Sequence, residues 1–355
     1  MNRSVLRAAV RCGVAVFVFS MLMGGIAQAQ TTKRVAVLMF KPRNYGTQWV
    51  TEATVRSVIW TATQSANKYF QEQSYGRMQL QGRLRVDGDV FGWYTVPYDN
   101  LGQCLGFGWA SAAKSMAAAQ GFVESNYDTI IFVTAATGCG GRAWTQGRTI
   151  TILSGFNYQT ISHELGHSFG LAHASAWICT SGGVRVAISS TCSANEYGDF
   201  AVMGKTTGFH MNNYQKGALG FFEASNTKTV TTTGVYDLYP TEMKTTLAQV
   251  LRIPRKFDAT GKVLDYYYLE FRQKFGFDTF SLSSPYVNGV LVRVAPDYSV
   301  KNAHSYLIDT TTPALTNFAD APIPVGGTFT DSTRKVSISV LSVTGGVAQV
   351  RVDFF

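Results

Sequence analysis

The residues with the clearest capacity for chemistry lie in one short stretch, HELGHSFGLAH. His163 and His167 are four residues apart, so on a helix their imidazoles lie on one face, one turn apart. Glu164 is next to the first histidine, where its carboxylate can reach a water bound to a metal. Gly170 permits a left-handed backbone conformation, so the chain can leave the helix there and bring His173 back towards the other two.

Three neutral imidazoles with an open fourth position are typical of a catalytic zinc site. Zinc lowers the pKa of a bound water to about 7, and Glu164 would accept the proton. An amphipathic core helix with a hydrogen-bonded histidine is the alternative interpretation. Only 5 of the 355 residues are histidine, which makes a chance occurrence of this arrangement rare. We therefore expect one Zn²⁺ at this motif.

The extended pattern HExxHxxGxxH resembles that of the metzincin zinc endopeptidases. That group also carries a methionine in a tight turn beneath the zinc, the Met-turn, and Met203 in the segment EYGDFAVMG is a matching candidate. With the segments SYGRMQL and DVFGWYTVP, the chain is most similar to the gametolysin-like branch, peptidase family M11, over roughly residues 34–224. Some metzincins place a tyrosine two residues after this methionine, but Lys205 stands there, so no tyrosine ligand is expected.

The resemblance implies a secreted zinc endopeptidase that hydrolyses extracellular or cell-wall proteins. In that reading His163, His167 and His173 bind zinc, Glu164 is catalytic, and the substrate is a protein or peptide. Two other functions stay open. One is a non-catalytic secreted protein that binds a wall polymer or glycan and keeps a relic zinc site. The other is a zinc hydrolase that acts on a non-peptide amide.

The first 29 residues have the pattern of a signal peptide. A start with three arginines and no acid precedes an apolar run over residues 13–25, and Ala27-Gln28-Ala29 suits cleavage. The apolar run is short for a bilayer span, although a single-pass anchor is the alternative. We expect a mature chain from about Gln30, extracellular or periplasmic, with no stable membrane association after the signal is removed. The sequence does not indicate an oligomeric state.

The net charge bears on which kinds of partner the protein can bind. The formal net charge of the whole chain is +9. Removal of the signal peptide with its three arginines leaves 9 − 3 = +6 for the mature chain, and these charges do not form runs, so no nucleic-acid partner is expected.

Four cysteines follow the signal peptide, and an even count in a secreted chain predicts two disulfides. Cys179 with Cys192 is favoured because the segment between them resembles a turn, which leaves Cys104 with Cys139 by elimination. A cysteine-zinc site is the alternative, but no C-x-x-C spacing supports it.

The apolar patterns predict an α+β protein in two parts. In residues 30–224 we expect a metzincin-like zincin catalytic domain, a mixed twisted sheet with an active-site helix over 158–172. Residues 149–153 are expected to form the edge strand that pairs with an extended substrate, and an interior strand is the alternative. Residues 137–147 and 174–194 read as loops. Residues 225–355 lose helical periodicity and predict an all-β, sandwich-like domain.

Three further polar residues have weaker signals. His210 is expected at the surface, although it could line the substrate cleft. Asp199 could hydrogen-bond a zinc-bound imidazole. His304 is isolated in the sequence and receives no role.

Overall fold

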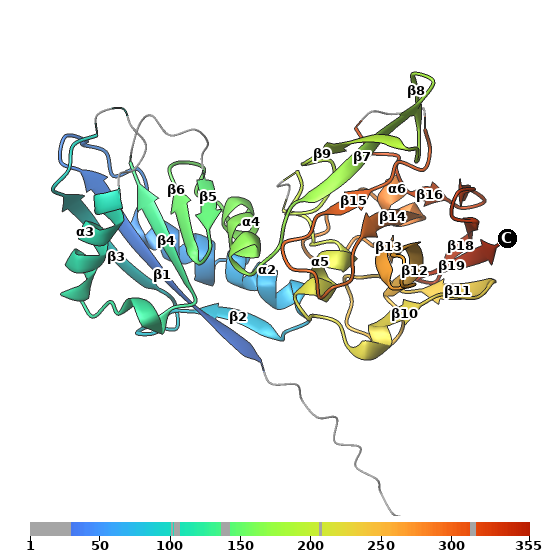
Figure 1. The fold of residues 1–355 in the computed structure, drawn as a ribbon. Coiled ribbons are helices and arrows are strands. Elements are labelled where there is room, and N and C mark those ends of the chain that lie inside the picture. Colours follow the sequence, from blue (N-terminus) through green and yellow to red (C-terminus); the bar gives the residue numbers. More distant parts are fainter. Residues whose placement is uncertain (1–29, 101, 103–106, 136–142, 206–207, 313–316) are drawn as a thin grey trace, which may run out of the picture.

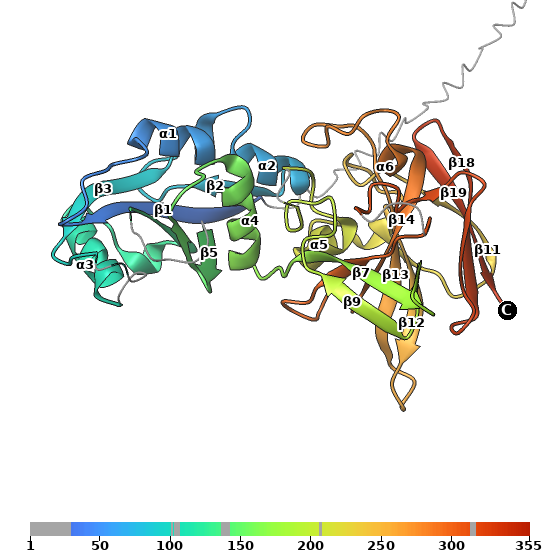
Figure 2. The same cartoon turned by 90° about the horizontal axis from the view of Figure 1, so that it is seen from above.

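The computed structural model describes residues 30–100, 102, 107–135, 143–205, 208–312 and 317–355. The protein is α+β, which confirms the expected class. Its strands form two groups, and helix α4 (Tyr158–Ser168) lies between them in both views (Figures 1 and 2). No helix in the described ranges is long and apolar enough to cross a membrane. The expected signal peptide and Cys104–Cys139 disulfide lie outside the described residues.

The first group is a six-stranded mixed sheet. Strand β1 is central and pairs in parallel with β2 and β3 on one side and with β4 on the other. Strand β6 is parallel to β4, and β5 closes this side as an antiparallel partner of β6. The strands are β1 (Thr31–Pro42), β2 (Met78–Gln81), β3 (Asp89–Val96), β4 (Thr129–Thr134), β5 (Ala143–Gln146) and β6 (Thr149–Ile152).

Alternating side chains of this sheet supply two apolar cores, since successive residues of a strand point to opposite faces. On one face, Val37 and Ile131 pack with α1, α2 and α4. On the other, Leu38 and Phe132 pack with α3. The helices are α1 (Glu52–Arg56), the π-helical turn η1 (Ser57–Thr61), α2 (Ala66–Gln73), α3 (Phe107–Ala118) and the 3-10 turn η2 (Glu124–Asn126).

The second group consists of a nine-stranded and a four-stranded sheet that share one core. Leu251 and Val292 of the larger sheet pack in the same cluster as Ile338 and Val350 of the smaller one. The larger sheet holds β7 (Ala174–Ser181), β8 (Val184–Val186), β9 (Thr191–Asn195), β10 (Thr227–Thr229), β12 (Val250–Phe257), β13 (Val263–Phe271), β14 (Gly289–Ala295), β15 (Ser305–Leu307) and β16 (Ile323–Pro324). The smaller holds β11 (Gly234–Leu238), β17 (Thr328–Asp331), β18 (Val336–Thr344) and β19 (Val347–Phe354). Short helices α5 (Asn213–Ala218), η3 (Ala224–Asn226) and α6 (Pro285–Asn288) connect strands.

The sheets divide earlier in the chain than the domain boundary expected near residue 224. Strand β7 pairs in parallel with β15, with Ala174 opposite Ser305 and Ala176 opposite Leu307. The expected loop over residues 174–194 is wrong, because β7, β8 and β9 form an antiparallel extension of the larger sheet there. The chain therefore enters this sheet directly after His173, and the candidate site lies where the two groups of strands meet.

Candidate metal centre

Helix α4 presents the first two histidines, and the chain that leaves it presents the third. The side chain of Asn157 caps the helix by accepting a 2.9 Å hydrogen bond from the Thr160 amide. At the other end Gly170 has φ +96°, a conformation that glycine adopts without strain. The Leu171 amide donates back to the Gly166 carbonyl at 3.0 Å. This reversal brings the chain to His173.

The three imidazoles converge through their Nε2 atoms. Nε2 of His167 lies 3.1 Å from Nε2 of His163 and 3.1 Å from Nε2 of His173. Every outer nitrogen, Nδ1, contacts an acceptor. These acceptors are the Val202 carbonyl at 2.8 Å, the Leu171 carbonyl at 2.8 Å and Oε1 of Glu196 at 2.7 Å, in the order His163, His167, His173.

These contacts assign the tautomers and test whether the group fits a metal. Carbonyl and carboxylate oxygens accept, so every Nδ1 carries the proton and every Nε2 presents a lone pair to the others. Three lone pairs this close repel unless a cation lies among them. Burial lowers the pKa of His163 to about 4 and also lowers the pKa of His173, which keeps both rings neutral at pH 7. His163, His167 and His173 can therefore hold a metal ion.

The carboxylate of Glu164 lies in the same cavity as the three imidazoles. It is largely buried, and Oε2 accepts a 2.6 Å hydrogen bond from the Thr145 hydroxyl on strand β5. Burial raises the pKa of Glu164, and the hydrogen bond from Thr145 opposes the rise. The side chain is thus held in place and is a stronger base than an exposed glutamate.

Met203 lies in a tight turn directly beneath the metal ligands. The Gly204 amide donates to the Ala201 carbonyl at 2.8 Å, which closes the turn, and Met203 is fully buried. A Cβ added at Gly166, between the two helical histidines, would collide with the Met203 sulfur. Glycine at this position therefore lets the turn approach the helix closely, and Val202 in the same turn accepts from His163.

Two buried arginines, one on strand β14 and one directly after strand β13, anchor the segment that carries this turn. Arg293 on β14 forms ion pairs with Asp199 at 2.6 Å and with Glu270 at 2.6 Å, and all three side chains are inaccessible. Arg272 donates to the Phe200 carbonyl at 2.7 Å. The expected contact of Asp199 with an imidazole is wrong, since Arg293 and Asn212 take its carboxylate oxygens. The floor of the site is thus fastened to the C-terminal part of the chain.

His210 belongs to the same buried polar region, so the expectation of a surface position is wrong. Its Nε2 lies 2.6 Å from Oε1 of Glu72, and its Nδ1 accepts from the Lys216 ammonium at 3.1 Å. The fully buried ring packs between α2 and α5, and charged partners from both helices make that burial possible.

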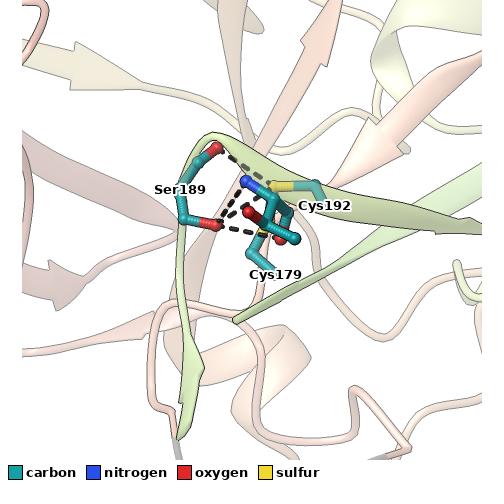
Figure 3. Close-up of a disulfide and its surroundings, with 4 residues drawn as sticks. Cys179, Ser189 and Cys192 are labelled. Carbon is teal, nitrogen blue, oxygen red and sulfur yellow. Dashed lines mark hydrogen bonds between the residues drawn. A yellow bond between two sulfur atoms is a disulfide. The ribbon is translucent and has the colours of Figure 1, made fainter. Parts of the chain in front are cut away.

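The disulfide between Cys179 and Cys192 confirms the favoured pairing (Figure 3). It joins β7 to β9, directly opposite in register. Strand β9 leads into Glu196, whose carboxylate meets His173, and into Tyr197, whose ring centroid lies 4.6 Å from that of His173. The disulfide therefore stabilises the segment that orients the third ligand.

The edge strand of the first sheet beside the cavity is β5, not the strand expected over residues 149–153. Strand β6 is interior, and within the described ranges β5 pairs with β6 alone. The sequence predicts a loop over residues 137–147, which are rich in glycine, but Ala143–Gln146 form strand β5. Gly147, with φ +60°, forms the turn that folds β5 back onto β6. Strand β5, not β6, lines the cavity beside Glu164.

The cavity around the metal ligands has a volume of about 720 Å³. One side is formed by β5 through Ala143, Trp144 and Thr145. Another side comes from the C-terminal part, through Asn302 and His304. His304, to which the sequence assigns no role, thus reaches the site from a distant part of the chain. Thr145 and Glu196 were also missed, and neither carries a local sequence signal.

Comparisons with known proteins add little to this geometry. The sequence matches no protein-family model, and no curated protein matches it. One of the solved structures that match is described as "Structure of a chaperone-substrate complex", with 16% sequence identity and a TM-score of 0.27. The alignment covers 41% of this chain and 24% of that chain. A likeness at this level carries no argument about fold or function.

Proposed function

We propose that this chain is a zinc-dependent endopeptidase with a metzincin-like catalytic region. The observation that carries the proposal is the convergence of three imidazoles beside a buried carboxylate in an open cavity. Zinc is the metal that such a set of three histidines with a vacant position suits best. The resemblance of the HExxHxxGxxH pattern and of the Met203 turn to metzincins supports the same assignment.

Several residues of this chain have separate roles in the proposed hydrolysis. Zinc, when bound, supplies a Lewis acid that polarises a carbonyl and lowers the pKa of water. Glu164 accepts the proton of the attacking water and passes it to the leaving amine, and its raised pKa suits both transfers. Thr145 holds that carboxylate, while Glu196 and the two carbonyls keep the imidazoles in the right tautomer.

Peptide is the substrate class that the cavity favours. An edge strand offers unpaired backbone N–H and C=O groups, and β5 lies along the cavity beside Glu164. An extended peptide can add to this edge as a further strand, which places a backbone amide near the metal ligands. A disulfide is typical of an oxidising compartment, so it supports export of the protein.

Proteolysis by the purified secreted chain tests the proposal. We expect it to cleave denatured casein or gelatin, to lose this activity on treatment with 1,10-phenanthroline, and to regain it with one equivalent of Zn²⁺. Mass spectrometry of the products should find new amino termini within peptide chains. Cleavage that persists without metal would contradict the proposal. Absence of cleavage with zinc bound would favour a non-peptide amide substrate or a binding role.

A further inference from the structure

His304 occupies a position in the cavity that no local sequence pattern indicates. It immediately precedes strand β15, and its ring centroid lies 6.0 Å from that of His173. The residue is half-buried and lines the cavity together with Tyr197 and Asn302. It is not one of the three histidines whose ligand nitrogens lie within 4.8 Å of one another. The ring thus lies beside the metal ligands without belonging to them.

Two neighbours fix the orientation of this ring. Its Nδ1 lies 3.0 Å from the hydroxyl of Ser175, a buried residue of β7. Its face stacks on Tyr306, at 5.9 Å between centroids and 18° between planes, and Tyr306 in turn stacks on Trp177. A ring held at its edge and its face is already ordered, so the His304 side chain loses little conformational freedom when a ligand binds.

The hydrogen bonds of Ser175 assign the protonated nitrogen. The Ser175 hydroxyl lies 3.1 Å from the Glu196 carbonyl, which can only accept, so the hydroxyl proton goes to that carbonyl. The serine oxygen then accepts from Nδ1–H of His304. In the neutral ring Nε2 is left with a lone pair. Among the described residues, no side chain or backbone group hydrogen-bonds to this Nε2.

We propose that His304 is a substrate-binding residue whose Nε2 accepts a hydrogen bond from a backbone N–H of the bound peptide. The inference rests on the proposed function. Strand β5 takes one edge of an extended substrate, and an extended peptide also directs N–H groups away from that strand. His304 lies on a part of the cavity that the C-terminal sheet forms, where it can accept one of these groups. The C-terminal part thus contributes a substrate-binding residue to the cleft.

Variants at this position, assayed with peptide substrates, test the inference. His304→Phe keeps a flat ring for stacking on Tyr306 and removes Nε2. We expect kcat/KM to fall about 3- to 10-fold, the range for one hydrogen bond, mainly through KM and with unchanged zinc content. His304→Gln restores an acceptor and should recover part of the loss. Lys301→Ala, an exposed residue of the same loop outside the cavity lining, is the matched control and should match the wild type.

Peptides methylated at successive non-scissile backbone nitrogens supply the readout that a structural role would not change. At one position, methylation should cost the wild type about 3- to 10-fold more in kcat/KM than it costs His304→Phe. Equal costs in both proteins at every position would overturn the inference while leaving the proposed function intact. If the zinc-loaded wild type cleaves none of the unmethylated peptides, the proposed function itself fails.

Discussion

Replacement of Arg293 by methionine tests whether the C-terminal sheet supports the metal site. The guanidinium lies between Asp199 and Glu270 at 2.6 Å from each, and all three side chains have 0% exposure. Removing one partner of a buried ion pair costs about 3–5 kcal/mol, because a charge is left buried without compensation. Arg293 compensates two carboxylates, so we expect Arg293→Met to lower the free energy of unfolding by about 5 kcal/mol.

The remaining contacts of the two carboxylates do not replace the arginine. Asp199 keeps one hydrogen bond from the Asn212 amide at 3.0 Å. Glu270 keeps two, from the Asn213 backbone at 2.6 Å and from the Thr241 hydroxyl at 3.3 Å. None of these donors carries a charge. The triple variant Arg293→Met, Asp199→Asn, Glu270→Gln removes all three charges together, so it should be clearly more stable than Arg293→Met alone.

Urea unfolding followed by intrinsic fluorescence measures these differences. Arg351→Met is the matched control, since its ion pair with Asp353 is exposed and such pairs contribute about 0–1 kcal/mol. The same anchor holds the segment leading to the turn whose Val202 carbonyl accepts from His163, so zinc affinity should fall as well. If Arg293→Met unfolds within about 1 kcal/mol of Arg351→Met, the buried charges do not anchor the site and the reasoning is refuted.

Three further predictions concern the ligands and their support. The depressed pKa of His163 means that the unfolded chain binds more protons between pH 6.5 and about 4. In the metal-free protein the neutral His163 should therefore contribute about 3 kcal/mol to the free energy of unfolding above pH 6.5, and this contribution should be lost as pH falls through 4. A pH series of unfolding curves for His163→Asn should lack this loss. Glu196→Ala leaves Nδ1 of His173 without its carboxylate and should weaken zinc binding about 10- to 100-fold by competition with a chelating dye, whereas an unchanged affinity would show that the contact has no effect. The double variant Cys179→Ala, Cys192→Ala opens a loop with a sequence separation of 13 and should lose about 3 kcal/mol in denaturant unfolding, and wild-type stability would contradict the bracing role.

The metal ligands and Glu164 could be predicted because their relation is local. Helical periodicity alone places His163 and His167 on one face, and a glycine that ends the helix is enough to return His173. The Cys179–Cys192 disulfide could also be predicted, because a short turn-like segment separates the two cysteines. The α+β class followed from the contrast between periodic segments and short apolar runs.

The residues that complete the site could not be predicted from local sequence patterns. Glu196 and His304 reach the cavity only because β7 pairs with β9 and with β15, and the second of these pairings joins residues about 130 positions apart. No periodicity in one segment specifies its partner. The sequence predicts a loop at strand β5 because the strand is only four residues long and glycines surround it. The burial of His210 depends on charged groups from several distant elements, which a sequence does not bring together.

The most direct test of the central claim is a joint measurement of zinc content and kcat in Glu164→Gln. This change keeps the shape of the side chain and the hydrogen bond from Thr145 but removes the base. We predict one Zn²⁺ per chain, as in the wild type, and a kcat for peptide cleavage about 10²- to 10⁴-fold lower. A variant that binds zinc normally and cleaves peptides within about 10-fold of the wild-type rate would contradict the role of Glu164 as the proton acceptor.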